Sequence, residues 1–505
     1  MSYNHGTFPH IFHKMFFHAR YFKLLLAIAL AARLAFMAAM PLTDPSESRY
    51  GVISANMARS GDFTVPRFIY RGEFQSFDGK PPLFFQIGGL ACKVLGENEF
   101  AVRLPSLLAA LGVLWLVHFT LRKLEGAEAA LAGVVLCATG SVFYLFSGLC
   151  MTDMVLTFCT TGAVCAYMLF ARADAVAQRR AKKSYSAAFF AFLGLGMLAK
   201  GPVAVVTSGL PVFAFVCAGR RWKELAQHAW VAGPALFLAI ALPWYAAMTL
   251  RQPGFLEYFF INENFLRFTT PDYGDRFGTG HETFPGMALV WFAVANLPWL
   301  PLAYAVWRGR GRGGGAERQN RAAFRGSLPA WACVCITGFW CLTSRSLLQY
   351  LVPTAPLFAM WLAAEMKGCG KPGPMRFVKT VAPVSCAALI FIMSVAMWRN
   401  GRTGKFPKRM YAEVLRVRRE NPEYAQTKFY FSQNAPFSAE FYVRDALRVH
   451  PGEQIEESLE NSRDDFLFIS KKRLEAIVKT GAAAPQREIV FENSGWYVFA
   501  PATKQ

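Results

Sequence analysis

Residues 24–39 read LLLAIALAARLAFMAA, and the following residues 40–51 read MPLTDPSESRYG. The first stretch is apolar over nearly the length that a helix needs to cross a bilayer, about 20 residues. The second places two carboxylates, Asp44 and Glu47, and the cation Arg49 at the end of that run. Polar residues mark the exit of any membrane-spanning helix, so these charges alone do not distinguish a helix end from a functional site.

The composition indicates that the bilayer is the main solvent of this chain. Of the 505 residues, 54% are hydrophobic, 15% are aromatic and only 17% are charged, which is too apolar for a soluble multi-domain protein. The formal net charge is +21, but the Lys and Arg residues fall in short clusters between apolar runs. That distribution is typical of membrane topology, so we expect no nucleic-acid partner.

A window of about 20 residues predicts a polytopic α-helical membrane protein with about eleven spans. A further stretch, PPLFFQIGGLACKVLG from Pro81, is short, begins with two prolines and carries Lys93, so we interpret it as an interfacial or re-entrant helix. With it the number of spans rises to twelve or thirteen. The predicted spans are 22–40, 103–121, 127–146, 151–171, 185–199, 203–218, 229–249, 286–307, 328–343, 347–365 and 377–397.

Basic clusters between the spans predict the orientation. With eleven spans all clusters fall on one side, which the positive-inside rule identifies as the cytoplasm. The N-terminus is then cytoplasmic, and the first run lacks a small-residue cleavage site, so we expect a retained span. The clusters are Lys14, Arg20 and Lys23, then Arg122 and Lys123, and the stretches 179–183, 219–223, 308–321 and 367–379.

The chain changes character near residue 400. The segments TKFYFS, LRVH, DFLFIS, REIVFE and WYVFA predict short strands, separated by helices at about 409–420, 436–444, 454–462 and 470–479. We predict two domains: a membrane domain, 1–400, with a large loop at 41–100, and an α/β domain, 401–505. An odd number of spans places the second domain on the side opposite the N-terminus.

The sequence does not indicate a disulfide framework, a zinc site or an ATP-binding loop. The eleven cysteines all precede residue 401 and lie mostly in spans, so they read as small buried residues and not as a disulfide framework or a zinc site. The sequence has no Walker-type phosphate loop, which argues against an ATP-driven pump.

The non-cytoplasmic loops hold charges that topology does not explain. Charges at the rim of a bilayer are costly unless they face water, one another or a ligand, so several from separate loops predict a shared polar cleft. These residues are Asp44, Glu47, Arg49, Asp78 and Lys80 in loop 41–100, Asp153 and Lys200 at helix ends, Glu263 and Arg267 in FFINENFLRF, and Arg345 in TSRSLLQY.

Each charge also has a structural interpretation, which stays open. A carboxylate at a helix start caps the helix or complements its dipole, and a cation suits the opposite end. An arginine near lipid head groups can also snorkel. The residues concerned are Asp44, Glu47 and Asp153 for capping, Lys200 for the dipole, and Arg267 and Arg345 for snorkelling.

Seven stretches along residues 22–365 carry a family resemblance. In order they are DPSESRYGVISANMARSGDFTVPRF, FDGKPPLFFQIGGLACKVLGENEFAVRLPSLLAALGV, TDMVLTF, MLAKGPVAVV, PWY, PGFLEYFFINENFLRF and SRSLLQYLVPTAPLFAMWLA. Their order and spacing resemble bacterial membrane glycosyltransferases of the ArnT and protein-mannosyltransferase type. The tail resembles the family's periplasmic domain in composition and expected elements only.

The resemblance implies a GT-C fold in the bacterial inner membrane, with the C-terminal domain in the periplasm. Such enzymes take a sugar from a polyprenyl-phosphate carrier and pass it to an acceptor on the periplasmic face. The implied partners are therefore this donor, a lipid (lipid A-like), glycan or protein acceptor, and membrane lipids.

The family motif D-E-x-R-Y corresponds to Ser46, Glu47, Arg49 and Tyr50. The first acid of the motif is thus a serine in this chain. Asp44, two residues upstream, is the expected replacement.

Other family positions also differ. The E-K-P element begins with Gly79, and the E-H pair reads Glu263 followed by Asn264. These differences leave Glu263 and Asp78 as weak metal-ligand candidates, so we expect no required cofactor, although a divalent cation held mainly by substrate phosphate stays compatible. Arg345 is the expected substitute for the lysine of the family's S-K-L-P-x-Y turn.

The residue types agree with this chemistry independently. Cleaving a sugar from a lipid phosphate leaves a phosphate whose negative charge grows in the transition state, and fixed cations stabilise it. A carboxylate can activate an attacking hydroxyl as a base. The catalytic candidates are Glu47, then Asp44, with Asp153, and the substrate or phosphate-binding candidates are Arg49, Tyr50, Lys80, Arg267, Arg345 and Tyr350.

Two other classes of function fit the sequence less well. A lipid flippase or secondary transporter would place ionisable residues near the middle of the membrane, often in repeated halves. We find no internal repeat and no charge in the middle of most predicted spans. A non-catalytic scaffold or sensor would need no matched acids and bases in loop 41–100.

Overall fold

The computed structural model has a helix, or a pair of helices, in each of the eleven windows predicted to span the membrane. It describes residues 8–502 except 71, 175, 271–272, 274–275, 278–281, 310–326, 344, 370–372, 403–406, 432–434, 444–446, 450–456, 458–459, 480–484 and 494. The helices in these windows are α1 (Phe8–Ala39), α4 (Glu99–Leu124), α5 (Ala127–Ala138) with α6 (Ser141–Phe146), α7 (Asp153–Arg172), α8 (Arg179–Lys200), α9 (Pro202–Gly219), α11 (Ala232–Arg251), α13 (Met287–Ala295) with α14 (Leu300–Gly309), α16 (Leu328–Cys341), α17 (Thr354–Gly368) and α18 (Gly373–Arg402).

Six helices in the described part of the chain are long and apolar enough to cross a membrane, judged by length and composition. They lie in α1, α4, α7, α9, α11 and α18, and the number is seven if α13 and α14, bent by 93°, form one broken span. The sequence-based number of about eleven also includes α8, α16, α17 and the pair α5 and α6. The chain is thus a multi-pass α-helical membrane protein.

The chain divides into two compact units, which are described separately. Unit 1 consists of Met1–Phe36, Asp78–Phe84 and Leu104–Ile390, and unit 2 consists of Met37–Phe77, Phe85–Arg103 and Phe391–Gln505. These two units are not the domains 1–400 and 401–505 expected from the sequence. That residues 1–400 and 401–505 are separate domains stays a prediction.

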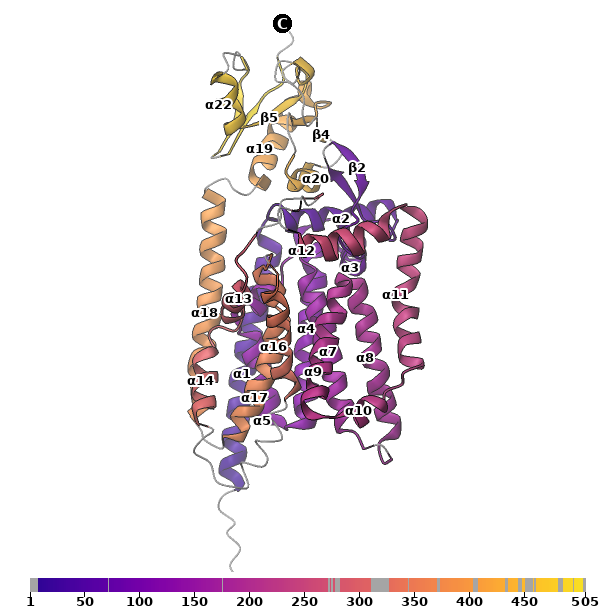
Figure 1. Ribbon diagram of the computed structural model, residues 1–505. Coiled ribbons are helices and arrows are strands. Elements are labelled where there is room, and N and C mark those ends of the chain that lie inside the picture. Colours follow the sequence, from indigo (N-terminus) through magenta and orange to yellow (C-terminus); the bar gives the residue numbers. More distant parts are fainter. Residues whose placement is uncertain are drawn as a thin grey trace, which may run out of the picture. The chain divides into compact units, whose positions relative to one another are not determined.

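In unit 1, helices α7, α8 and α9 lie side by side (Figure 1). Helices α7 and α8 are antiparallel, because Lys182 near the start of α8 donates to the carbonyl of Ala173 after α7, whereas Lys200 at the end of α8 meets Asp153 at the start of α7. The 22 residues of α8 cover about 33 Å at 1.5 Å per residue, similar to the hydrocarbon core of a bilayer. The other elements of unit 1 are α10 (Trp222–Ala226), the π-helix η1 (Glu257–Leu266), α12 (Arg267–Thr269) and the 3-10 helix η3 (Leu348–Leu351).

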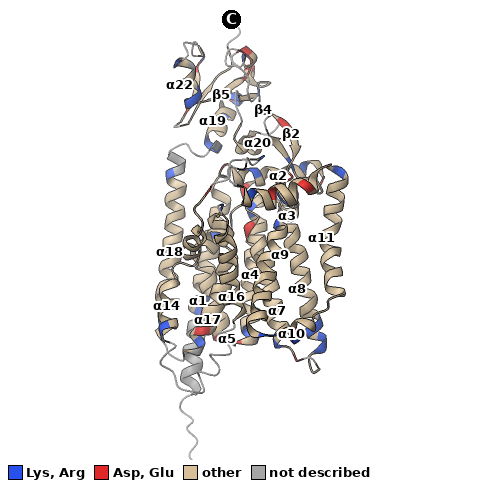
Figure 2. Ribbon diagram, in the orientation of Figure 1, with Lys and Arg blue, Asp and Glu red and all other residues tan. Residues whose placement is uncertain are grey.

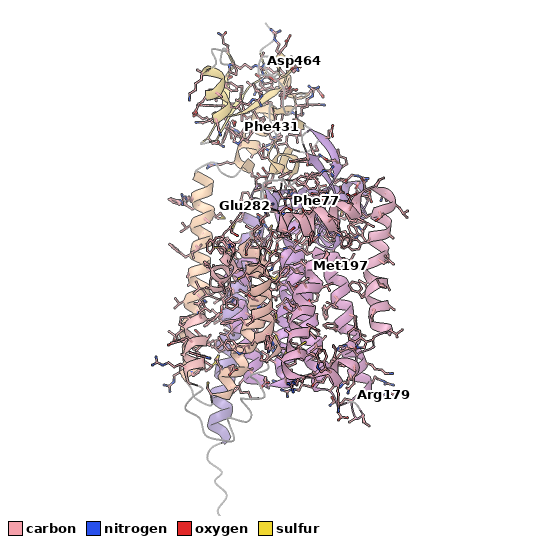
Figure 3. The ribbon with its side chains drawn as sticks, viewed as in Figure 1. Phe77, Arg179, Met197, Glu282, Phe431 and Asp464 are labelled. Atoms are coloured by element: carbon pink, nitrogen blue, oxygen red, sulfur yellow. The ribbon has the colours of Figure 1, made fainter. Side chains whose placement is uncertain are left out.

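One end of unit 1 is basic. Figure 2 shows Lys and Arg residues at the end of α8 and α9 where α10 lies, and Figure 3 labels Arg179 at this end. Lys123 donates to the Tyr185 hydroxyl at 2.9 Å, and Lys367 lies 3.5 Å from Glu125. Basic residues from separate loops therefore share one end, whereas Asp153 lies at the other.

In unit 2, the segment after the first span forms a helix and a hairpin. Helix α2 (Ser46–Ser60) begins within the charged stretch after the first span, and it ends at Gly61, whose φ of 72° favours glycine. The antiparallel hairpin of β1 (Arg67–Tyr70) and β2 (Glu73–Ser76) was not predicted. The stretch from Pro81 forms α3 (Leu83–Leu95).

The tail carries all five predicted strands in one sheet, with the order β4-β3-β5-β7-β6. Strand β3 pairs in parallel with β4 and β5, and β7 pairs antiparallel with β5 and β6. Alternate residues face opposite sides of a strand. Accordingly, Phe429, Phe431, Phe466 and Phe468 fill one core, and Leu467 belongs to another. Figure 3 labels Phe431.

Three predicted tail helices are present, and the fourth, at 454–462, lies largely outside the described residues. The tail elements are α19 (Pro407–Glu420), the 3-10 helix η4 (Pro422–Tyr424), β3 (Phe429–Phe431), α20 (Phe437–Val443), β4 (Leu447–Val449), β5 (Phe466–Ser470), α22 (Lys471–Lys479), β6 (Ile489–Glu492) and β7 (Trp496–Phe499).

Candidate functional site

A buried ion pair joins two predicted site residues of unit 1. The Lys200 ammonium lies 2.5 Å from Oδ1 of Asp153, and the two residues are 8% and 2% exposed. Thr152, which precedes Asp153, makes no side-chain capping hydrogen bond. Oδ2 of Asp153 receives no hydrogen bond from the described residues, so this carboxylate keeps an oxygen that is available to a ligand.

An aromatic wall adjoins this ion pair. The Lys200 ammonium lies 4.8 Å from the ring centroid of Tyr350, which stacks on Trp340 with centroids 4.3 Å apart. Phe268 contacts both rings. A cation over an aromatic face is attracted by the quadrupole of the ring, so Tyr350 holds Lys200 in place.

A second cluster centres on Glu263. Its side chain is 5% exposed, and Oε1 accepts hydrogen bonds from Lys80 and, at 2.5 Å, from Nη1 of Arg267. Glu263 lies in the π-helix η1, a form that occurs frequently at functional sites. Two cations thus share one carboxylate oxygen of Glu263. The guanidinium carbon of Arg267 lies 5.9 Å from the ring centroid of Phe268, so this cluster also meets the aromatic wall.

Arg345 is a buried cation with unused donors. It is 4% exposed, and Nη2 donates to the carbonyl of Tyr273 and to Glu282, both at 3.1 Å. Nε and Nη1 are also buried and find no hydrogen-bond partner among the described residues. Leaving such donors unsatisfied costs free energy, so this guanidinium is suited to receive an anion.

Asp78, the other weak ligand candidate, lies 3.4 Å from Arg276. No group of three or more His, Cys, Asp and Glu side chains that could hold a metal occurs among the described residues. The expectation that no cofactor is required remains a prediction.

In unit 2, Glu47 belongs to a closed hydrogen-bond network. Its Oε1 accepts from Nε of Arg103 at 2.8 Å, and its Oε2 accepts from the Thr43 amide and hydroxyl at 3.0 and 2.9 Å. Arg103 also donates to the carbonyls of Met37 and Pro41. Glu47 and Arg103 are 3% and 2% exposed, so the pair holds the end of α1 to the start of α2.

Both carboxylate oxygens of Asp44, like those of Glu47, accept hydrogen bonds. Its Oδ1 and Oδ2 accept from the Ser438 amide and hydroxyl, at 3.0 and 2.5 Å. Burial raises the pKa of the Asp44 carboxyl, although the Ser438 bonds oppose that shift. The sequence gives no signal for this contact, because Ser438 lies 394 residues away.

Arg49 is surrounded by aromatic rings of unit 2. Its guanidinium carbon lies 5.6, 5.2 and 5.5 Å from the ring centroids of Tyr50, Phe77 and Phe437. Tyr50 packs edge-on against Phe85. Rings over its faces orient a planar guanidinium, whose hydrogen-bond donors lie along its edge.

Helix α20 of the tail supplies further contacts that were not predicted. Glu440, 5% exposed, accepts from the Asn56 amide at 2.7 Å and from the Ile69 backbone at 2.8 Å. Tyr442 accepts from the Leu42 backbone at 2.9 Å. Within unit 2, α20 therefore holds the helix and hairpin that follow the first span.

The chain is similar to one described protein family and to several named relatives. Residues 79–246 match the family described as dolichyl-phosphate-mannose-protein mannosyltransferase. Two similar relatives are named undecaprenyl phosphate-alpha-4-amino-4-deoxy-L-arabinose arabinosyl transferase. The one from Edwardsiella ictaluri is 30% identical over 54% of this chain and 48% of its own length. The one from an Enterobacter species is 28% identical over 74% and 65%.

Solved structures agree on the fold. ArnT from Cupriavidus metallidurans bound to undecaprenyl phosphate matches with a TM-score of 0.73 and 18% identity, over 95% of this chain and 99% of that one. An archaeal oligosaccharyltransferase, AglB from Archaeoglobus fulgidus, matches with a TM-score of 0.54 and 14% identity, over 88% and 65%. The resemblance to ArnT-like and protein-mannosyltransferase-type membrane glycosyltransferases is confirmed, and the chain has their GT-C fold.

We predict that Glu47→Ala lowers the free energy of unfolding by about 3 kcal/mol or more, because losing one partner of a buried ion pair leaves the other charge unpaired. Thermal unfolding of the purified protein in detergent measures the effect. The control is Glu413→Ala, which removes an exposed pair with Arg416 and should cost less than about 1 kcal/mol. Equal shifts for the two variants would contradict the structural role of Glu47.

Proposed function

We propose that this chain is a membrane glycosyltransferase. It moves a sugar from a polyprenyl-phosphate carrier to a lipid (lipid A-like), glycan or protein acceptor. The names of the curated relatives and the ligand of the Cupriavidus structure support this class of reaction. The matched segments span 48% and 65% of the length of these two relatives, so the identity of the sugar and of the acceptor is itself part of the proposal.

The observation that carries the proposal is Arg345, a buried guanidinium with two donors that no described residue satisfies. A phosphate oxygen matches such donors in charge and geometry. When the bond between the sugar and the carrier phosphate breaks, negative charge grows on the phosphate, and a cation already fixed in position stabilises it without reorganisation. Lys80, Lys200 and Arg267 are further cations of unit 1 suited to this role.

Among the carboxylate candidates, Asp153 fits a catalytic role best. Both oxygens of Glu47 and of Asp44 accept hydrogen bonds from their own chain, whereas Oδ2 of Asp153 receives none from the described residues. We therefore assign Asp153 as the group that positions, or accepts the proton of, an attacking hydroxyl. Lys200 donates a hydrogen bond to Oδ1 of Asp153 and so orients the carboxylate. Arg49 remains a candidate phosphate ligand, with Tyr50 orienting it.

The proposed orientation places the basic end of unit 1 in the cytoplasm of a bacterial inner membrane. The contacts of Lys123 and Lys367 bring basic loops to one end, and the positive-inside rule assigns that end to the cytoplasm. Asp153 then lies at the periplasmic end of α7. The N-terminus is cytoplasmic, and residues 401–505 form a periplasmic domain.

The purified protein, incubated in detergent with sugar-loaded undecaprenyl phosphate and lipid A, should release free carrier phosphate in step with acceptor labelling. Asp153→Asn should cut turnover about a hundredfold, the typical contribution of a positioned acid or base, and spare carrier binding. Arg345→Met should weaken carrier binding as well as turnover, because it removes a phosphate contact present in both states. Glu47→Gln and Asp44→Asn in parallel identify the principal carboxylate.

Two results would contradict this proposal. Movement of the carrier across vesicles without cleavage of the sugar bond would show transport in place of transfer. A correctly inserted Asp153→Asn protein with normal turnover would remove Asp153 from the chemistry.

We predict that chelator treatment leaves most of the activity, because Lys80 and Arg267, which both bind Oε1 of Glu263, repel a metal ion from this carboxylate. Activity is measured before and after incubation with EDTA and dialysis, with heat-inactivated protein as the blank. Loss of activity that zinc restores would disprove the prediction.

The orientation predicts that a reporter active only in the periplasm, fused after Gln505, will function. A cytoplasmic reporter fused at the same point should be silent, and fusions after Arg308 should give the reverse pattern. Activity of the cytoplasmic reporter at Gln505 would overturn the topology.

A further inference from the structure

Arg33 is a charged residue within the first membrane-spanning helix that the sequence analysis did not single out. It lies inside the candidate span Arg20–Ala39 and is 2% exposed. Nη2 donates to the carbonyl of Leu145 at 2.8 Å, and the guanidinium carbon lies 5.8 Å from the ring centroid of Tyr144. An ionisable residue at this depth is costly and is retained mainly where it serves a function.

The guanidinium of Arg33 packs against the turn that follows α6. A Cβ atom at Gly148 would lie 2.2 Å from Nε and 2.7 Å from Cζ of Arg33. A side chain at this position would require the guanidinium to move. Arg33 therefore contacts the end of α6 through the carbonyl of Leu145 and the following turn at Gly148.

Ser106 of α4 forms hydrogen bonds with later residues of the same turn. Its hydroxyl lies 2.5 Å from the carbonyl of Leu149 and 3.2 Å from that of Met151. Asp153 follows two residues later and opens α7. The backbone leading into Asp153 is thus held from two helices, at its start by Arg33 and at its end by Ser106.

We propose that Arg33 and Ser106 are positioning residues that fix Asp153 through the turn 147–152. The inference rests on the proposed transfer reaction, in which Asp153 is the catalytic carboxylate. The carboxylate is anchored to Lys200 through one oxygen only, so the path of its backbone decides where the other oxygen points. A misplacement of about 1 Å in a catalytic group can cost about a hundredfold in rate.

The test uses Ser106→Ala with Ser385→Ala as its matched control. Ser385 also donates from its hydroxyl to a backbone carbonyl across helices, to Thr139 at 2.7 Å, but it does not touch the turn. In the transfer assay we expect Ser106→Ala to lower kcat about tenfold and to change KM for the donor less than about twofold. Ser385→Ala should change neither parameter by more than about twofold.

Non-additivity distinguishes positioning from a general loss of stability. If Ser106 acts through Asp153, adding Ser106→Ala to Asp153→Asn should cost nothing further in kcat, because residues that act as a unit are not additive. A second substitution that changes the same turn is Gly148→Ala, because the added methyl group collides with Arg33. Its effect on kcat should be smaller in an Arg33→Ala background, where the colliding atoms are absent.

Three results would overturn the inference. They are a Ser106→Ala enzyme with normal kcat, equal losses for Ser106→Ala and Ser385→Ala, and a full additional loss in the Asp153→Asn background. An inactive wild-type protein would instead refute the proposed transfer reaction, and this inference would fall with it. The wild-type assay therefore separates the two failures.

Discussion

A charge removed from water needs a partner of opposite sign or a ligand, and this constraint organises the polar residues within each unit. In unit 1 it joins Asp153 to Lys200, and in unit 2 it joins Glu47 to Arg103. The partners are 47 and 56 residues apart, so each pair also ties together segments that the chain alone would leave free. The polar network is thus part of the architecture of the helices that carry it.

The same constraint separates carboxylates that maintain structure from those that can react. A buried ion pair adds little net stability over an apolar replacement, so its value lies in the geometry that it fixes. Both carboxylate oxygens of Glu47 accept hydrogen bonds from its own chain, whereas one oxygen of Asp153 does so among the described residues. From the sequence, Glu47 is the first candidate for a base and Asp44 the second. The hydrogen-bond geometry is the reason that we propose Asp153 ahead of Glu47.

The periodic features of the chain were predictable from sequence. Apolar runs mark helices wherever the surroundings are lipid, and a short apolar run such as Phe466–Ser470 marks a strand, here buried at four of its five positions. The contacts of the charged residues were not predictable in the same way. Lys80 meets Glu263 across 183 residues, and Ser438 meets Asp44 across 394, and neither spacing has a local signature. The hairpin and the π-helix were also missed.

Because Glu263 lies in a π-helix, the position of its carboxylate depends on the number of residues in this segment. A π-helix bonds residue i to i+5 where an α-helix bonds i to i+4, so it corresponds to an α-helix that has gained extra residues. Successive residues of an α-helix differ by about 100° around its axis. Removing one residue upstream would rotate the carboxylate away from Lys80 while leaving every charged side chain in the sequence. In diverging relatives, a one-residue gap in this segment would therefore be as consequential as the loss of the glutamate itself.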